Sequence, residues 1–228
     1  MEQGHATTWV VIPTFNESQV MSEVVAQVLR HYSHVVVIDD GSSDETGAIA
    51  AREGAIVLRH PINLGQGAAL QTGITFVLSR DAEYIVTFDG DGQHQADDVD
   101  RMLTALRKSG AEVALGSRFC GDVIGAPWSR RTLLKAAAML TMLTTGLKVT
   151  DTHNGLRVFT RHAAAKLHIR QNRMAHASEI LSQIAQHGLH YIEVPVTIRY
   201  TAYSLSKGQG IGDAANILAD LLMGRFVR

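Results

Sequence analysis

Short runs of β-branched and aliphatic residues recur through the first half of the chain, and each run ends in polar or glycine-rich sequence. Runs of this length and composition are typical of strands that are buried on both faces of a parallel sheet. The pattern predicts five such strands, at residues 10–14, 35–39, 55–58, 84–88 and 112–115.

Longer amphipathic segments separate these runs, with apolar residues at helical spacing across residues 20–29, 70–78 and 99–106. The sequence Ser42-Ser43-Asp44-Glu45 places a serine three residues before a glutamate, which predicts a helix start directly after the second strand. Regular alternation of strand and helix predicts an α/β fold, with a parallel sheet between two helical layers and ligands at the carboxyl ends of the strands.

The pattern loosens after Gly121. We expect an apolar helix over residues 133–149, a small hairpin-like piece around 155–160, and another helix marked by Ala177, Ile180, Leu181 and Ile184. Residues 203–210 are expected to form a flexible loop. A C-terminal amphipathic helix would follow, with one face formed by Ile211, Ala214, Ala215, Leu218 and Leu222.

Composition narrows the class of protein. A chain of 228 residues with 46% hydrophobic residues is long enough for one sizeable core, so we expect a single domain. The net charge of -1 provides no general field for nucleic acid, and the single cysteine excludes an internal disulfide. Residues 1–8 lack the apolar core of a signal peptide, and residues 133–149 are too short and too polar for a membrane span, so we expect a cytoplasmic protein.

Polar sequences follow the first three strands. Pro13-Thr14-Phe15-Asn16-Glu17 offers an aromatic ring and a carboxylate that suit a nucleoside, although an ordinary turn with Asn16 or Ser18 as helix cap explains it as well. After the second strand, Asp40 or Asp44 could accept hydrogen bonds from a base or ribose, or could serve as a capping residue.

Two common phosphate-binding motifs are missing. Asn63-Leu64-Gly65-Gln66-Gly67 precedes a helix and would let backbone amides approach a ligand, but the dinucleotide pattern G-x-G-x-x-G fails at Leu70. The chain also has no G-x-x-x-x-G-K-[ST] loop. Dehydrogenase and kinase-like functions therefore lose their main support.

The most specific feature is Asp89-Gly90-Asp91-Gly92-Gln93-His94, directly after the fourth strand. Two carboxylates one residue apart can hold a hard divalent cation and leave positions for water and phosphate oxygens. A calcium-binding EF-hand is excluded, because it requires glycine where His94 stands and a helix in place of the strand. The alternative is that the carboxylates only cap the following helix.

Further charged residues follow the fifth strand. Arg118 in Gly116-Ser117-Arg118, and Arg130 and Arg131 before the apolar segment, could bind phosphate or could be solvated surface residues. In Asp151-Thr152-His153-Asn154-Gly155, either Asp151 or His153 could act as a base or simply form a turn.

Six motifs in this order resemble the family 2 glycosyltransferases, and within them the dolichol- and polyprenyl-phosphate sugar transferases. They are VVIPTFNE at 10–17, VIDDGSSDET at 37–46, NLGQGAALQTG at 63–73, FDGDGQH at 88–94, GSR at 116–118 and DTHNGLRVF at 151–159. The resemblance implies the GT-A fold, a Rossmann-like three-layer α/β/α sandwich with a mostly parallel sheet, and transfer with inversion at the sugar.

The resemblance also assigns site residues. Asp89, Asp91 and Gln93 are expected to hold Mg²⁺ or Mn²⁺ beside the diphosphate of a GDP- or UDP-hexose. The nucleotide would contact Pro13, Phe15, Asn16, Glu17, Asp40, Ser42, Asn63, Gly67, Asp89 and Gly90. We expect one glycosyltransferase domain over 1–228, with a nucleotide-sugar half (1–120), an acceptor half (121–200) and the flexible loop and amphipathic helix (201–228).

The acceptor decides which residues act in catalysis. A cation at Asp91 would neutralise the leaving diphosphate. A lipid monophosphate, with a second pKa near ~6, already presents an anionic oxygen and favours Arg118 and Arg131 as clamps. A sugar hydroxyl of a cell-surface glycan or lipid-linked saccharide needs a base, for which Asp151 is the candidate.

Three other expectations stay open on sequence alone. The apolar segments favour a membrane surface or a small membrane-protein partner at the inner face of the cell membrane, although both segments could belong to the core. A non-catalytic nucleotide-sugar-binding module would use the same pocket. A sugar-nucleotide pyrophosphorylase would need a basic glycine-rich loop near the N-terminus, and that loop is missing.

Overall fold

A seven-stranded sheet forms the centre of the protein, for which the computed structural model describes residues 7–120, 123–124, 146–200 and 203. The strand order is β3-β2-β1-β4-β7-β5-β8. The strands of this sheet are β1 (Thr8–Thr14), β2 (His34–Asp39), β3 (Ile56–Arg59), β4 (Tyr84–Thr87), β5 (Val113–Ser117), β7 (Arg157–Thr160) and β8 (Tyr191–Pro195). All neighbours are parallel except β7, which runs antiparallel to both β4 and β5.

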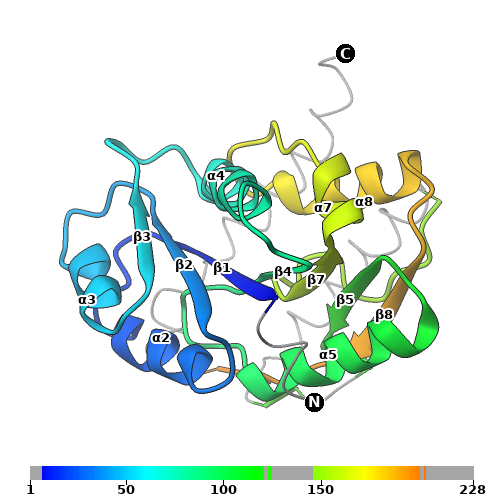
Figure 1. Ribbon diagram of the computed structural model, residues 1–228, viewed down its shortest axis with the longest axis horizontal. Helices are drawn as coiled ribbons and strands as arrows, with labels where there is room; N and C mark the ends of the chain where they lie inside the picture. Colours follow the sequence, from blue (N-terminus) through cyan, green and yellow to red (C-terminus); the bar gives the residue numbers. More distant parts are fainter. Residues whose placement is uncertain (1–6, 121–122, 125–145, 201–202, 204–228) are drawn as a thin grey trace.

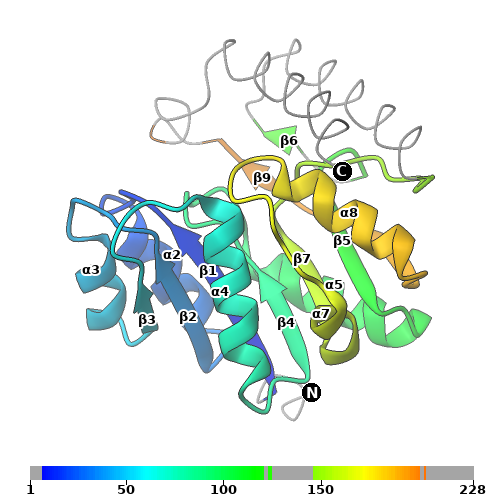
Figure 2. The ribbon, with the colours of Figure 1, turned by 90° about the horizontal axis from the view of Figure 1, so that it is seen from above.

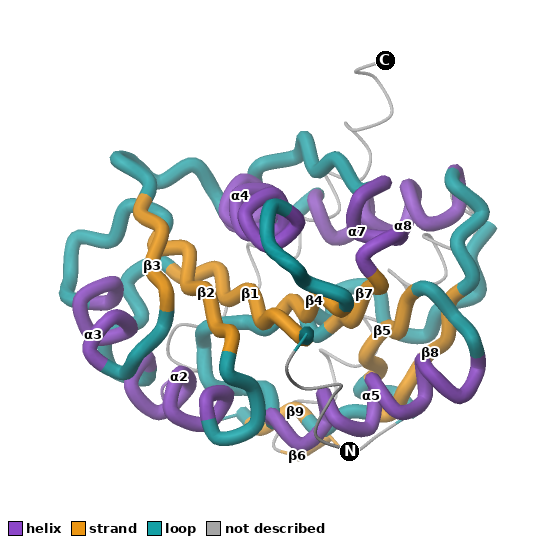
Figure 3. Tube along the Cα trace, in the orientation of Figure 1, coloured by secondary structure: helices purple, strands orange, loops and turns teal. Residues whose placement is uncertain are grey.

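Helices cover both faces of this sheet. In Figure 1, α4, α7 and α8 lie on one side of the strands and α2, α3 and α5 lie on the other. Figure 3 shows the same three layers by type of element. The helices are α2 (Met21–Leu29), α3 (Thr46–Arg52), α4 (Gln66–Leu78), α5 (Ala96–Ser109), α7 (Arg161–Lys166) and α8 (His176–Gln186).

The alternation of side chains along β1 separates two cores. Val11 packs in one cluster with Ile74 of α4, whereas its neighbour Ile12 packs in the other with Val24 of α2 and Leu106 of α5. Successive strand residues point to opposite faces of a sheet, so a continuous apolar run supplies both layers at once. The α/β fold and the helical faces predicted for the first half are therefore confirmed.

The segment expected to form a hairpin is instead the fifth strand of the sheet. Strand β7 lies between β4 and β5, with Val158 opposite Val86 on one side and opposite Ala114 on the other. Leu156, Val158 and Phe159 are buried on its two faces, which explains why this short run enters the sheet. The hairpin prediction was wrong, because residues 157–160 form a single strand that pairs with β4 and β5. Its side chains pack into both cores.

Two helix predictions also need correction. Residues 146–149 are not helical: Lys148 N–H donates to the Tyr191 hydroxyl at 3.0 Å, and Leu147 and Val149 are buried in that conformation. Residues 133–145 lie outside the described part. Ser42 does not cap α3, because the helix begins at Thr46.

The remaining described strands form a small second sheet. Strands β6 (Val123–Ile124) and β9 (Ile198–Arg199) pair in parallel, and Figure 2 shows them above the large sheet. Within the described ranges no helix is long and apolar enough to cross a membrane. Arg130, Arg131 and the segments 204–210 and 211–222 lie outside those ranges. The sheet takes strands from both sides of residue 120, and the division into two functional halves stays a prediction.

Candidate active site

One edge of the sheet collects the predicted site. Strands β1, β2, β4 and β5 are parallel and end together at this edge, and antiparallel β7 begins there. The sequences that follow Thr14, Asp39, Thr87 and Ser117 therefore meet the residues that precede Arg157. This is the edge at which open α/β sheets bind ligands.

The turn after β1 is hydrogen-bonded to the turn after β2. Asn16 adopts a left-handed backbone conformation with φ 55°, and its N–H donates to Ser42 Oγ at 2.9 Å. Its side-chain oxygen accepts from Ser43 N–H at 2.8 Å, and Glu17 N–H donates to Thr46 Oγ1 at 2.8 Å. The structure thus brings together the expected nucleoside residues of both turns, and their contact with a nucleoside stays a prediction.

Phe15 has an exposed ring beside this junction, with 42% of its surface accessible. Glu17 accepts a hydrogen bond from the Tyr203 hydroxyl at 2.6 Å, across 186 positions of the sequence. Gly90 joins the ends of β4 and β1, since a Cβ on it would lie 3.1 Å from the Pro13 carbonyl oxygen. Phe15 and Glu17 directly follow β1, so both lie at the sheet edge that collects the predicted site.

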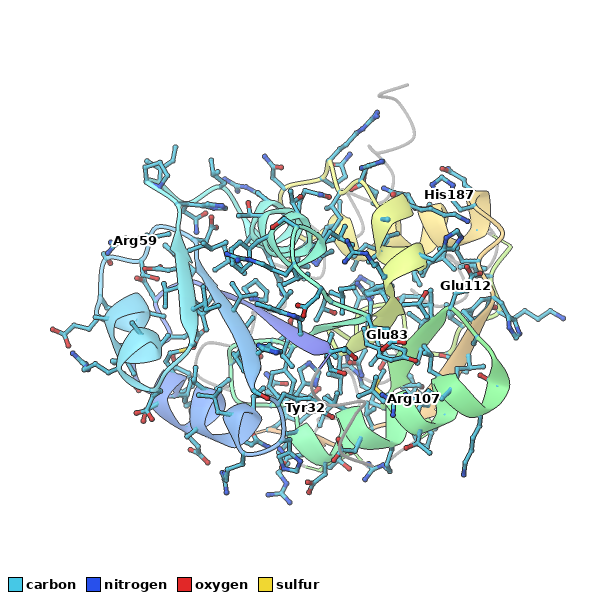
Figure 4. All side chains as sticks on the ribbon, in the orientation of Figure 1. Tyr32, Arg59, Glu83, Arg107, Glu112 and His187 are labelled. Atoms are coloured by element: carbon cyan, nitrogen blue, oxygen red, sulfur yellow. The ribbon has the colours of Figure 1, made fainter. Side chains whose placement is uncertain are left out.

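Asp40 organises the loop between β3 and α4. Its buried carboxylate accepts from His60 Nδ1 at 2.7 Å and from the N–H groups of Leu64 and Gly65 at 3.0 and 2.7 Å. Arg59, labelled beside β3 in Figure 4, donates to the Ser42 carbonyl at 2.8 Å. Both carboxylate oxygens of Asp40 therefore already accept hydrogen bonds from the protein. Asp40 would influence a bound nucleoside by holding the loop between β3 and α4 in position.

The glycines at the start of α4 allow the backbone of residues 171–172 to pack closely against them. A Cβ on Gly65 would lie 2.2 Å from the Asn172 carbonyl oxygen, and one on Gly67 would lie 2.0 Å from that of Gln171. Gly67 N–H donates to Asn172 at 2.8 Å. This packing explains both glycines, while Asn63 is exposed in the loop. Contact of a nucleotide with Asn63 or Gly67 stays a prediction.

Asp89 is held from three sides. Gln66 Nε2 donates to Oδ1 at 2.9 Å, and His94 Nε2 lies 3.0 Å from Oδ2. Gly155 packs against the carboxylate so closely that a Cβ there would lie 2.1 Å from Oδ2. Burial opposes ionisation of Asp89, but the hydrogen bond from His94 and the charge of Arg157 outweigh it and lower the pKa. Asp89 is thus a fixed anion.

Asp91 differs from its neighbour. Burial and repulsion from Asp89 raise the pKa of Asp91 to about 6, and its Oδ1 accepts from Gln93 N–H at 3.0 Å. Two carboxylates that oppose each other's ionisation are suited to a divalent cation. Among the described residues, no group of three or more Asp, Glu, His or Cys side chains is arranged to hold a metal ion by itself. Mg²⁺ commonly binds one or two carboxylates and completes its coordination with water and substrate phosphate. Asp91 and Gln93 fit a site of this kind.

Arg118 and Asp151 form a buried ion pair at the end of β5. Arg118 is 9% exposed and Asp151 is 4% exposed. Arg118 also donates from Nη1 to the Tyr200 hydroxyl at 3.3 Å. Burial would lower the pKa of Arg118, but the charge of Asp151 outweighs it and raises that pKa. Arg131, the other predicted clamp, lies outside the described residues.

Arg157 and two histidines whose charges interact with it, His153 and His176, were missed as site residues or left ambiguous by sequence reasoning. Arg157 is 3% exposed, and burial lowers its pKa to about 10. Burial and the charge of Arg157 lower the pKa of His176 to about 4, and burial lowers that of His153. The available signal for Arg157 was a charge inside the apolar run 156–159. No comparable signal marked His176.

Comparison with known proteins agrees with this geometry. The sequence model of glycosyl transferase family 2 matches residues 9–167. A UDP-N-acetylglucosamine–dolichyl-phosphate N-acetylglucosaminyltransferase of Methanococcus voltae is 29% identical over 94% of this chain and 94% of its own length. A polyprenol monophosphomannose synthase of Mycolicibacterium smegmatis is 30% identical over 89% of this chain and 81% of its own length.

A solved structure shows the same architecture. Glucosyl-3-phosphoglycerate synthase from Mycobacterium tuberculosis, in complex with Mn²⁺, UDP and glucosyl-3-phosphoglycerate, superposes with a TM-score of 0.74 at 20% identity. The match covers 96% of this chain and 80% of the other. Similarity at this level of identity concerns the fold, and it confirms the three-layer GT-A arrangement.

Proposed function

The chain belongs to glycosyl transferase family 2, and we propose that it is an inverting, metal-dependent transferase that moves a hexose from a GDP- or UDP-sugar to a polyprenyl phosphate. The observation that carries the choice of acceptor is the ion pair of Asp151 with Arg118. A carboxylate that is already held by an arginine is a poor base for a sugar hydroxyl, whereas a phosphate acceptor needs no base.

The donor would bind at the ends of β1, β2 and β4. Asp91 and Gln93 would hold Mg²⁺ or Mn²⁺, which supplies positive charge to the departing diphosphate. Asp89 is already fixed by Gln66 and His94. It would therefore keep its position beside the sugar diphosphate while negative charge develops on the leaving group. Similar solved structures of glucosyl-3-phosphoglycerate synthase contain Mn²⁺ or Mg²⁺ together with UDP, which supports this assignment.

The acceptor would approach from the β5 side. Arg118 and Arg131 would bind its phosphate group, because planar guanidinium groups match phosphate oxygens. One phosphate oxygen attacks the anomeric carbon opposite the leaving group, the bond from that carbon to the diphosphate breaks, and the configuration inverts. The two relatives are named as a dolichyl-phosphate N-acetylglucosaminyltransferase and a polyprenol monophosphomannose synthase. These names support a lipid phosphate as the acceptor.

A transfer assay tests the proposal. Purified protein with Mg²⁺ or Mn²⁺ is offered UDP- and GDP-hexoses, together with a short polyprenyl phosphate, a saccharide or 3-phosphoglycerate. We expect sugar transfer to the lipid phosphate and its loss with EDTA. Transfer to saccharide or phosphoglycerate alone would replace the acceptor, and transfer that resists EDTA would overturn the metal assignment. Donor binding by calorimetry with no transfer or hydrolysis would favour a non-catalytic binding module.

A lipid acceptor also implies a place of action. We propose that the protein works in the cytoplasm, peripherally at the inner face of the cell membrane or on a small membrane protein there, because the phosphate of a polyprenyl lipid lies at the bilayer surface. Co-sedimentation with vesicles that contain polyprenyl phosphate tests this. Binding to such vesicles is expected, and complete recovery in the supernatant would contradict direct contact with the bilayer.

A further inference from the structure

Glu193 lies in the edge strand β8 and binds the segment that carries Asp151. Its Oε1 accepts from Thr150 N–H at 2.8 Å, from Thr150 Oγ1 at 2.9 Å and from Asp151 N–H at 3.3 Å. Tyr191, two residues earlier and on the same face of the strand, binds the same segment, because its hydroxyl accepts from Lys148 N–H at 3.0 Å. Two side chains therefore hold this segment against β8.

A chain of hydroxyl groups connects Glu193 to the turn after β5. Thr150 donates its hydroxyl proton to Glu193, so Ser117 is the donor in the 2.6 Å contact between Ser117 Oγ and Thr150 Oγ1. Ser117 Oγ in turn accepts from the N–H groups of Phe119 and Cys120 at 3.2 and 3.3 Å. An ionised carboxylate accepts hydrogen bonds and donates none. Glu193 therefore sets the direction of every hydrogen bond in this chain.

Both connections from Glu193 end at the buried pair of Arg118 and Asp151. Asp151 is held through its own N–H, and Arg118 belongs to the turn that the Ser117 hydroxyl stabilises. Glu193 thus fixes the backbone on both sides of the pair without being a member of it. A buried ion pair is favourable only when its geometry is accurate, so this support bears directly on the guanidinium.

We propose that Glu193 is a positioning residue, which keeps the Arg118 guanidinium in the orientation needed to bind the phosphate of the acceptor. This role in transfer rests on the proposed function, whereas the effect of Glu193 on the position of Arg118 does not. Residues that orient a binding side chain commonly change affinity or activity by about 10- to 100-fold. Since Glu193 supports Arg118, its loss should weaken binding of the acceptor and leave binding of the donor intact.

Steady-state kinetics separate this role from a general contribution to stability. Glu193→Met removes the accepting oxygens at similar length, and we expect the KM for polyprenyl phosphate to rise about 10-fold. The variant's kcat and donor KM should stay within about threefold of wild type, because Arg118 binds the acceptor alone. Glu193→Gln keeps an oxygen that can accept and should restore the acceptor KM to within about threefold of wild type.

The matched control lies at the other end of β5. Glu112, labelled in Figure 4, directly precedes β5, and its Oε2 accepts from His190 N–H at 3.1 Å just before β8. Glu112→Met therefore removes the same kind of contact between a carboxylate and a neighbouring segment, away from the site. It should leave the KM for polyprenyl phosphate within about twofold of wild type.

Modification of arginines by phenylglyoxal tests the position of Arg118 without a transfer assay. Arg118 is 9% exposed and should react slowly, as measured by mass spectrometry of its peptide. In Glu193→Met its reaction should be at least about fivefold faster, because the turn opens more often without its support. Arg59, whose side chain is 62% exposed, is the internal standard and should react equally in all variants. Glu193→Gln and Glu112→Met should keep the wild-type rate at Arg118.

An unchanged rate at Arg118 in a folded Glu193→Met variant would overturn the proposal, as would equal increases in the donor and acceptor KM. If Glu193→Met does not fold, Thr150→Val decides. This substitution removes only the hydroxyl that joins Ser117 to Glu193, and it should speed the reaction of Arg118 at least about twofold. A wild-type rate there would refute the role of Glu193. If the wild-type protein transfers no sugar to lipid phosphate, the proposed function fails, and the modification rates still decide whether Glu193 positions Arg118.

Discussion

Arg118 donates from Nε to Oδ2 of Asp151 at 2.6 Å, and its backbone N–H donates to the same oxygen at 3.1 Å. Asp151 N–H in turn donates to Glu193 of β8 at 3.3 Å. The carboxylate thus anchors an arginine at the end of β5 and is itself anchored to the neighbouring strand. In the proposed function, Asp151 would orient Arg118 for an anionic acceptor.

Asp151→Asn separates this role from that of a base. We expect unfolding free energy to fall by about 3 kcal/mol, because Arg118 stays buried without its partner, while kcat with polyprenyl phosphate falls less than tenfold. Removal of a general base would instead cost about 100-fold or more. Urea unfolding and initial rates measure the two effects. A stable variant with a loss of 100-fold or more would return Asp151 to the role of base.

The sequence was sufficient to predict the sheet edge but not the insertion of β7. Continuous apolar runs identified the five strands of the first half, and helical spacing identified three of its four helices, α2, α4 and α5. The rule for strand ends placed Asp89 and Asp91 correctly at the edge. Strand β7 has four residues, and its partners β4 and β5 are distant in sequence, so no local pattern revealed its place. Arg157 and His176 depend on that tertiary placement.

A glycine-rich motif also does not tell whether a ligand or another part of the chain packs against the glycines. The loop before α4 was interpreted as room for a ligand, and Gly65 and Gly67 do need that room, but the backbone of 171–172 fills it. A glycine in such a loop indicates a close contact, but the local sequence does not identify the contacting group. The capping serine failed for a related reason, because Ser42 bonds to Asn16 of another turn.

Asp91→Asn tests the cation site. The substitution removes a charge from the proposed metal ligand, so we expect kcat to fall at least about 100-fold and the affinity for Mn²⁺ in the presence of nucleotide to weaken. Folding should be retained, because the neighbouring charge of Asp89 no longer opposes a second buried anion. Metal titration by calorimetry, transfer rates and Tm give the three readouts. Asp81→Asn, at an exposed position before β4, is the matched control and should leave all three unchanged. Wild-type turnover in Asp91→Asn would refute the assignment.

Gly155→Ala tests whether the position of Asp89 matters. The new Cβ would lie 2.1 and 2.3 Å from the two carboxylate oxygens, so the carboxylate must move. We expect kcat to fall about 100-fold, as misplacement by about 1 Å can cause. Transfer assays and circular dichroism measure activity and folding.

Gly188→Ala is the control for a general loss of stability. Gly188 has φ 60° with open space around it, so alanine there strains the backbone far from the site. We expect a loss of about 1–2 kcal/mol in unfolding free energy and an unchanged kcat. If Gly155→Ala keeps wild-type kcat, the site tolerates displacement of Asp89 and its proposed role is wrong.

His176 makes stability depend on pH. Its folded pKa of about 4 lies below the value of 6.5 for a free imidazole, because burial and Arg157 oppose protonation. Below pH 6.5 the unfolded chain therefore binds a proton that the folded chain does not, and stability falls as pH falls toward 4. At pH 5 this loss amounts to about 2 kcal/mol relative to pH 7.5, and the contribution is fully present above pH 6.5.

His176→Asn should remove this part of the pH dependence. The asparagine amide can replace the hydrogen bond between Nδ1 and the Arg173 carbonyl, which is 2.7 Å long, without a group that titrates. Urea unfolding at pH 7.5 and pH 5 should show a stability difference about 2 kcal/mol smaller in the variant than in the wild type. His168→Asn, at an exposed position, should retain the wild-type difference. Because protonation of His176 would place a second cation beside Arg157, an unchanged difference in His176→Asn would mean that the imidazole is not held neutral by this environment.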